Sequence, residues 1–142
     1  MNNFYNDKVQ DHTFSILVEN EPGVLARVIG LLSGRGYNID TLTVAEVDEE
    51  EGLSKITIVS SGTPMVLEQI RAQLERLVPV RAVSDLTVDG PSVERELALV
   101  KVAGEGESRV ESLRIADIFR ARAVDSTNTS FVFEIVGSTE KL

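Results

Sequence analysis

The sequence contains no cysteine, a single histidine and no long apolar run, and each of these absences excludes a class of function. Without cysteine the chain cannot form disulfides, thiolate metal sites or a cysteine nucleophile, which is compatible with the cytoplasmic location that we expect. The lone His12 has no second histidine with which to hold zinc, and a serine–histidine–aspartate relay would need partners that the sequence does not offer. We therefore predict no metal site and no catalytic residue, and we expect His12 to lie at the surface where a strand begins.

Positive charge is also scarce, because 14 lysines and arginines face 23 aspartates and glutamates, for a formal net charge of −9 at pH 7. Nucleic acids and anionic membranes attract clustered lysine and arginine, so we expect this chain to bind neither. No apolar run approaches the ~20 residues that are needed to span a bilayer. The first residues lack the charged and apolar regions of a signal peptide, and we predict that residues 1–11 form a flexible polar tail.

The remaining sequence has the composition of a globular protein, with 42% hydrophobic and 26% charged residues in 142 positions. Apolar residues recur at period two or at helical spacing, and Pro, Gly and acidic clusters separate these runs. Thr63 precedes the second helical run, and its residue type and position predict an N-cap. The predicted elements are a strand at 12–19, a helix at 22–33, strands at 37–47 and 53–60, a helix from 63 that Pro79 stops, and a strand at 80–88.

This order, βαββαβ, is typical of the ferredoxin-like fold, an antiparallel sheet with both helices on one face. We therefore predict an α+β domain over residues 12–90. The uncovered face or the edge of such a sheet is a natural surface for oligomer formation. Ala26 and Gly30 lie on the first helix and are small, so a neighbouring chain could approach closely there.

A second unit occupies residues 91–142, and it repeats the first part of the same pattern. The alternation at 96–103 predicts a strand, and 107–121 predicts a helix with apolar Val110, Leu113, Ile118 and Phe119. Residues 123–126 and 131–136 predict a hairpin. The order is βαββ and stops at Leu142, where a second helix would begin, so we predict an incomplete ferredoxin-like domain.

Two polar segments that could suggest a site are better explained as turns. Residues 48–51 are consecutive acids, whereas a calcium loop needs alternating ligands and a distal bidentate glutamate. Residues 104–109 begin like a dinucleotide fingerprint, but Arg109 occupies the position of the third glycine and acidic side chains would face the pyrophosphate. We interpret the first as a solvated hairpin and the second as a strand-to-helix turn.

The segment Asn-Glu-Pro-Gly-Val-Leu at residues 20–25 is a stronger candidate because it joins a strand to a helix N-terminus. Helix N-termini offer unpaired N–H groups and a partial positive charge, which suit a carboxylate. Gly23 permits close approach of the backbone, and the Asn20 amide offers both a donor and an acceptor. A second polar turn, at residues 36–40, contains Asn38 and Ile39. From local sequence alone, each segment is also explained as an ordinary turn without a ligand.

Taken together, these segments resemble a known family. The βαββαβ order with Glu-Asn-Glu-Pro-Gly-Val-Leu at the first turn resembles the ACT domain, an amino-acid-sensing module. A longer similarity, to the regulatory small subunit of acetolactate synthase, extends from about Thr13 to Leu142. It is carried by residues 17–31, by residues 35–45, which begin Arg-Gly-Tyr-Asn-Ile-Asp, by Val-Glu-Arg-Glu-Leu-Ala-Leu-Val-Lys-Val at 93–102, and by Asp-Ile-Phe-Arg at 117–120.

The resemblance implies a non-catalytic subunit that activates a thiamine-diphosphate-dependent catalytic subunit and confers feedback inhibition by a branched-chain amino acid, usually valine. Thiamine diphosphate, Mg and FAD would belong to that partner, and this chain would hold no cofactor. It also implies a homodimer through the ACT domains, with the effector between two chains and Asn38 and Ile39 supplied by the partner chain. The effector residues expected on this basis are Asn20, Glu21, Pro22, Gly23, Val24, Leu25, Asn38 and Ile39.

Other functions compatible with the fold are weaker. A free-standing ACT sensor that regulates another enzyme or transcription is the main alternative, and the segment at 93–102 argues against it. A small ferredoxin-like enzyme would need a convergent acid–base set. Metal chaperones of this fold need paired cysteines, and RNA-recognition modules need basic and aromatic sheet faces.

Overall fold

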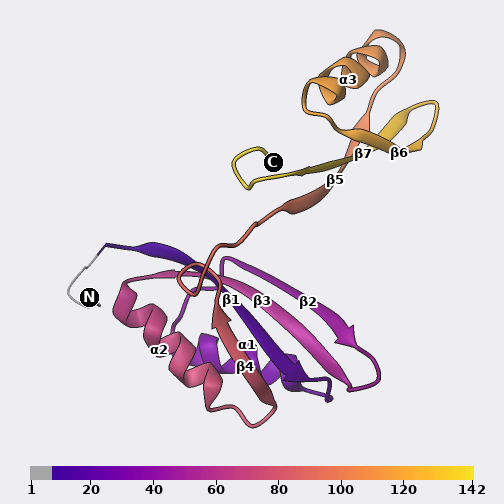
Figure 1. The fold of residues 1–142 in the computed structure, drawn as a ribbon. Coiled ribbons are helices and arrows are strands. Elements are labelled where there is room, and N and C mark those ends of the chain that lie inside the picture. The colour runs from indigo at the N-terminus through magenta and orange to yellow at the C-terminus, as the bar shows by residue number, and fades with distance from the viewer. Residues whose placement is uncertain (1–7) are drawn as a thin grey trace. The chain divides into compact units, whose positions relative to one another are not determined.

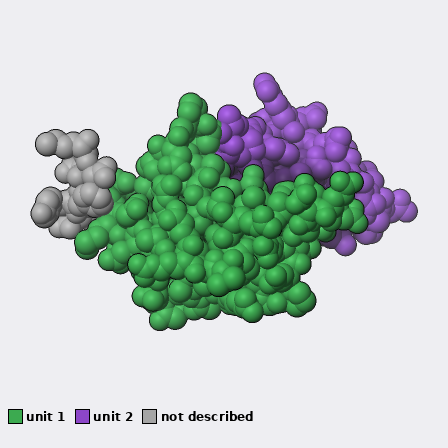
Figure 2. Space-filling view, turned by 60° about the horizontal axis from the view of Figure 1, so that its bottom comes forward, with its two compact units in different colours: residues 1–92 green, residues 93–142 purple. Residues whose placement is uncertain are grey.

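The computed structural model describes residues 8–142, which form two compact units that divide between Ser92 and Val93 (Figure 2). Most of the predicted N-terminal tail, residues 1–7, lies outside the described residues. The first strand begins at Gln10, so the last two residues of that predicted tail are part of the sheet. Within residues 8–142, no helix is long and apolar enough to cross a membrane.

The first unit has the predicted βαββαβ order and is ferredoxin-like (Figure 1). Its strands pair antiparallel throughout, in the spatial order β2-β3-β1-β4. Residues of α1 and α2 share one buried cluster with the inward-facing residues of β1, β3 and β4, so both helices cover the same face of the sheet. The elements are β1 (Gln10–Glu19), α1 (Val24–Gly34), β2 (Thr41–Asp48), β3 (Leu53–Gly62), α2 (Pro64–Glu75) and β4 (Val80–Asp85).

Apolar periodicity places this core. Phe14, Ile16 and Val18 alternate along β1 and are buried on the helix-facing side. On α1, Val24, Val28 and Leu32 are buried at helical spacing, and α2 contributes Leu67, Ile70 and Leu74. The predicted N-cap of α2 is confirmed, because the Thr63 hydroxyl accepts a hydrogen bond from the Val66 amide at 3.4 Å.

Several predicted boundaries differ from the structure, and three of these differences have a clear local reason. The helix α1 begins at Val24 and not at Pro22, because Gly23 has a left-handed φ of 83° that a helix cannot contain. Strand β2 begins at Thr41 and not at residue 37, because the chain first turns, with the Tyr37 amide donating to the Leu32 carbonyl at 3.0 Å. Strand β4 ends at Asp85 because the next residues fold into a turn, in which the Asp89 amide donates to the Asp85 carbonyl.

The expected surface position of His12 is wrong, because its side chain is buried. Strand β1 begins at Gln10, so His12 has the same inward orientation as Phe14. Its Nδ1 lies 2.6 Å from the Asp85 Oδ2, and its Nε2 lies 3.2 Å from the Gln10 Oε1. A buried polar ring needs such partners, and here they join the start of β1 to the end of β4.

The second unit has the predicted βαββ order, with β5 (Glu96–Ala103), α3 (Gly106–Ile118), β6 (Arg122–Ser126) and β7 (Ser130–Gly137). Its three strands pair antiparallel in the order β5-β7-β6. The buried cluster is small and consists of Ala116, Phe131 and Phe133. The Arg109 guanidinium lies 4.0 Å above the Phe131 ring and donates hydrogen bonds to the Ser126 hydroxyl and the Thr127 carbonyl, which fastens α3 to the β6–β7 hairpin.

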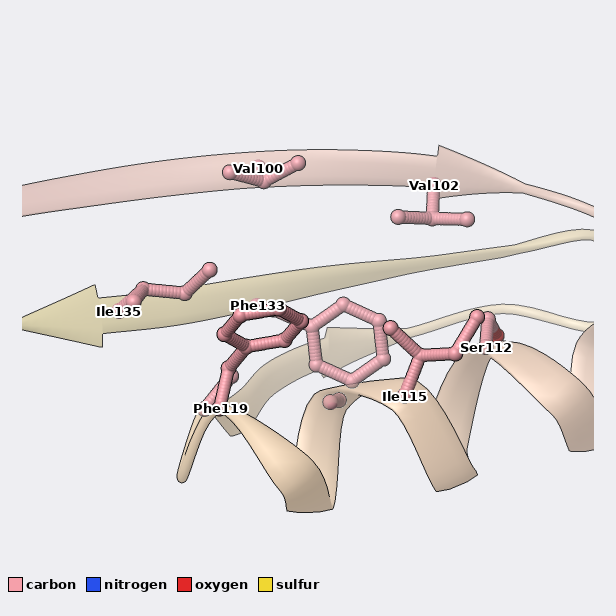
Figure 3. A pocket seen from close by; sticks show the side chains of 9 residues that line it. Val100, Val102, Ser112, Ile115, Phe119, Phe133 and Ile135 are labelled. Carbon is pink, nitrogen blue, oxygen red and sulfur yellow. The ribbon is translucent and has the colours of Figure 1, made fainter. Parts of the chain in front are cut away.

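The apolar side chains of the second unit are only partly covered. Ile118 is 76% exposed and Leu99 on β5 is 63% exposed, although their sequence pattern is that of core residues. The apolar residues predicted on the third helix, Val110, Leu113, Ile118 and Phe119, are all exposed, and Ala116 occupies the buried position instead. An open groove of about 200 Å³ separates α3 from the sheet (Figure 3), and its lining is Val100, Val102, Ser112, Ile115, Ala116, Phe119, Ala121, Phe133 and Ile135.

Candidate functional site

The turn after β1 is held in place by backbone hydrogen bonds to two other loops. The Glu19 amide donates to the Pro79 carbonyl at 2.9 Å, and the Asn20 amide donates to the Gly52 carbonyl at 2.7 Å. The chain can then reverse into α1 because Gly23 takes a φ of 83°, a conformation that strains any residue with a Cβ. Glu21, Pro22 and Gly23 are all exposed, so this turn lies at the surface and not in the core.

The first amides of α1 form the electrostatic feature of this turn. Gly23 is the N-cap and has no side chain, so it cannot satisfy the free N–H groups, and the first turn contains no acidic residue. The Val24 amide donates to the Glu21 carbonyl at 3.3 Å. Within residues 8–142, the Leu25 and Ala26 amides donate to no backbone carbonyl. These amides, with the partial positive charge of the helix N-terminus, suit an anionic group such as a carboxylate.

The side chains of the predicted site residues around this turn differ in their environment. Val24 is buried in the core, so only its backbone can contact a ligand, whereas Leu25 is 38% exposed. The Asn20 amide donates to the Glu46 Oε1 at 3.4 Å, and both side chains are exposed. Glu46 lies on the edge strand β2 and was not anticipated from the sequence, because nothing in its local pattern distinguishes it from a surface acid.

The second predicted segment forms a polar cluster at the end of β3. Asn38 is exposed, and its Nδ2 lies 2.5 Å from the Asp40 Oδ1 and 3.4 Å from the Ser61 Oγ. The Ser61 hydroxyl in turn donates to the Asp40 Oδ2 at 2.5 Å. Ile39 is half-buried against the core of the first unit. The sequence analysis did not identify Asp40 and Ser61 as members of this cluster, because Ser61 lies 21 positions from Asp40 and reaches it only through the fold.

A single chain does not bring the two predicted segments together. Asn20 lies beside Gly52 at the start of β3, whereas Asn38 lies beside Ser61 at the end of the same strand. At the usual rise of a β-strand, nine residues separate these positions by about 30 Å. A pocket that uses both segments therefore requires two chains.

No catalytic or metal-binding arrangement accompanies these segments in the part of the chain that the structure describes. There, no three His, Asp or Glu side chains converge in a way that could hold a metal ion. The buried pair of His12 and Asp85 has no nucleophile in its hydrogen-bond set, since the remaining partners are the Gln10 side chain and the Thr87 amide.

Comparison with known proteins covers both units. Residues 14–82 match the family of AHAS small subunit-like ACT domains, and residues 95–142 match the family described as the small subunit of acetolactate synthase. A probable acetolactate synthase small subunit from Archaeoglobus fulgidus is 46% identical over 131 residues, which are 92% of this chain and 80% of that protein. The small subunit of acetolactate synthase isozyme 3 from Escherichia coli is 48% identical over 128 residues, covering 90% of this chain and 77% of that protein.

A crystal structure gives the same result in three dimensions. The acetolactate synthase small subunit from Thermotoga maritima superposes with a TM-score of 0.83 at 37% identity, over 93% of this chain and 81% of that chain. The turn before α1 and the Asn38 cluster thus fall within the first family match, and most of the second unit falls within the second. The chain belongs to the family of acetolactate synthase small subunits.

Proposed function

We propose that this chain is the regulatory subunit of acetolactate synthase, which activates the catalytic subunit and makes it sensitive to inhibition by valine. The observation that carries this proposal is the similarity of both units to acetolactate synthase small subunits. A free-standing ACT sensor would account for residues 14–82 but not for the match over residues 95–142. Thiamine diphosphate, Mg and FAD belong, on this proposal, to the catalytic partner.

The turn before α1 is the proposed site for the carboxylate of the amino acid. The free amides of Leu25 and Ala26 point along the helix axis toward the N-terminus, where the helix dipole favours negative charge. A Cβ on Gly23 would meet no other heavy atom within 4 Å, so the backbone there is open to a ligand. The exposed Leu25 side chain offers an apolar surface for the aliphatic part of the ligand.

The other half of the proposed site comes from a second chain, which contributes Asn38 and Ile39. The separation of about 30 Å between the two segments within one chain supports this arrangement. The surface of the first unit offers a place for the partner: Ala26 and Gly30 are exposed and small on α1. On β2, one of the two edge strands of the sheet, Val44 and Val47 are 46% and 51% exposed. We propose a homodimer through these elements, with the effector linking its two chains.

The binding step can be tested without the catalytic partner. Isothermal titration of the full chain with L-valine, L-leucine and L-isoleucine should give saturable heat with valine, with one or two ligands per dimer. Sedimentation of the same samples should show at least a dimer at micromolar concentration. A monomeric chain that binds none of the three amino acids would overturn the proposed effector site.

A further inference from the structure

We propose that Asp40 and Ser61 are positioning residues that orient the Asn38 amide, so that this cluster recognises the ammonium group of the effector. The inference rests on the proposed function, because it assigns a role within the proposed effector site. It goes further by fixing the polarity of the ligand: the carboxylate lies at α1 of one chain, and the ammonium lies at Asn38 of the other.

The orientation of the Asn38 amide is dictated by the chemistry of its neighbour. An ionised carboxylate can only accept hydrogen bonds, so the amide nitrogen and not the amide oxygen must face Asp40, at 2.5 Å. Ser61 strengthens this arrangement, since its hydroxyl donates to the other carboxylate oxygen and its Oγ can accept from the Asn38 Nδ2 at 3.4 Å.

The backbone around the cluster is anchored as well. The Asp40 amide donates to the Val59 carbonyl at 2.8 Å, and the Ser60 hydroxyl donates to the Asn38 carbonyl. Ser60 is fully buried, so this second bond is shielded from competing water. The cluster is thus formed at the end of β3, an interior strand of a packed sheet, and its geometry is present before any ligand binds.

The consequence is that Asn38 presents an acceptor to solvent. Both of its contacts use Nδ2, which leaves the Oδ1 free within residues 8–142, beside the negative charge of Asp40. A carbonyl oxygen next to a carboxylate attracts an ammonium group and repels a second carboxylate. The site should therefore distinguish an α-amino acid from a carboxylic acid of the same aliphatic skeleton that lacks the amine.

The test compares two ligands that differ in this one group, L-valine and 3-methylbutanoate, by NMR titration of the full chain, which reaches millimolar affinities. The variants are Asp40→Asn and Ser61→Ala, with Asp117→Asn on the exposed face of the second unit as the matched control. Asp40→Asn should weaken valine binding about tenfold, which corresponds to the low end of the free-energy range for a hydrogen bond to a charged group. The same substitution should leave 3-methylbutanoate binding within about twofold of the wild type. Ser61→Ala should weaken valine binding about threefold, and Asp117→Asn should change neither ligand.

The ligand comparison separates positioning from structural damage, because a collapsed site would lose both ligands alike. If Asp40→Asn weakens both ligands equally, or neither, while the wild type binds valine, the positioning role is overturned and the proposed function stands. If the wild type binds neither ligand, the proposed effector site itself fails, and this inference fails with it.

Discussion

Replacing Gly23 tests the effector turn most sharply, because two substitutions there share the strain of a left-handed Cβ and differ in charge. Gly23 has a φ of 83°, so both Gly23→Ala and Gly23→Asp must place a Cβ in the left-handed region, at a cost of roughly 1–2 kcal/mol. Neither side chain meets a neighbour within 4 Å of its Cβ, so no steric term adds to this cost. We expect both variants to fold, with a melting temperature lowered by about 4–8 °C.

Only Gly23→Asp adds a carboxylate where the ligand's own carboxylate is expected. Two such charges about 4 Å apart repel by roughly 1 kcal/mol in water and more where water is partly excluded. Because Gly23 is exposed, we take the lower value, which corresponds to about a fivefold loss of valine affinity, and occupation of the anion position adds to it.

The assay is valine titration of both variants alongside their thermal unfolding. Gly23→Ala should bind valine close to the wild-type affinity, and Gly23→Asp should bind it at least about fivefold more weakly at a similar melting temperature. Equal valine affinity in the two folded variants would refute the placement of the carboxylate at this turn.

Three further substitutions probe the fold, each measured as a change in the free energy of unfolding. Asp85→Ala should cost about 3 kcal/mol, because it leaves the buried His12 ring and the Thr87 amide without their acceptor, and a loss below about 1 kcal/mol would contradict the pairing. Arg109→Lys should cost about 1–2 kcal/mol, since the lysine ammonium cannot stack flat on a ring and donate to two oxygens at once. An unchanged free energy of unfolding would contradict this role of Arg109. Thr63→Ala should cost about 1 kcal/mol through loss of the α2 cap, whereas Thr63→Ser should keep most of the stability that the cap provides.

The sequence predicted the first unit well wherever apolar period and capping chemistry acted together. Phe14, Ile16 and Val18 alternate, and that alternation alone predicts a buried face. The His12 prediction failed because the strand starts at Gln10, two residues before the predicted start at residue 12. Burial of His12 also depends on Asp85, which lies 73 positions away in the sequence and reaches it only through the pairing of β1 with β4.

The candidate site was predictable in its segments but not in its internal geometry. The residue types at Asn20 and Gly23 indicate a ligand-compatible turn, yet the left-handed conformation of Gly23 moves the helix start to Val24. The role of Ser61 depends on β3 ending beside Asn38, which is a tertiary relation. In the second unit, apolar periodicity predicted the helix and the strands, but the same pattern does not predict that the Ile118 side chain remains exposed.

The most direct test of the regulatory function is acetolactate formation by the catalytic subunit from the same organism, with and without this chain. With thiamine diphosphate, Mg and FAD present, addition of the chain should raise the rate, and valine should then lower it only when the chain is present. The chain alone should form no acetolactate. A rate that does not respond to the chain, or valine inhibition that is the same without it, would contradict the assignment of this protein as the regulatory subunit.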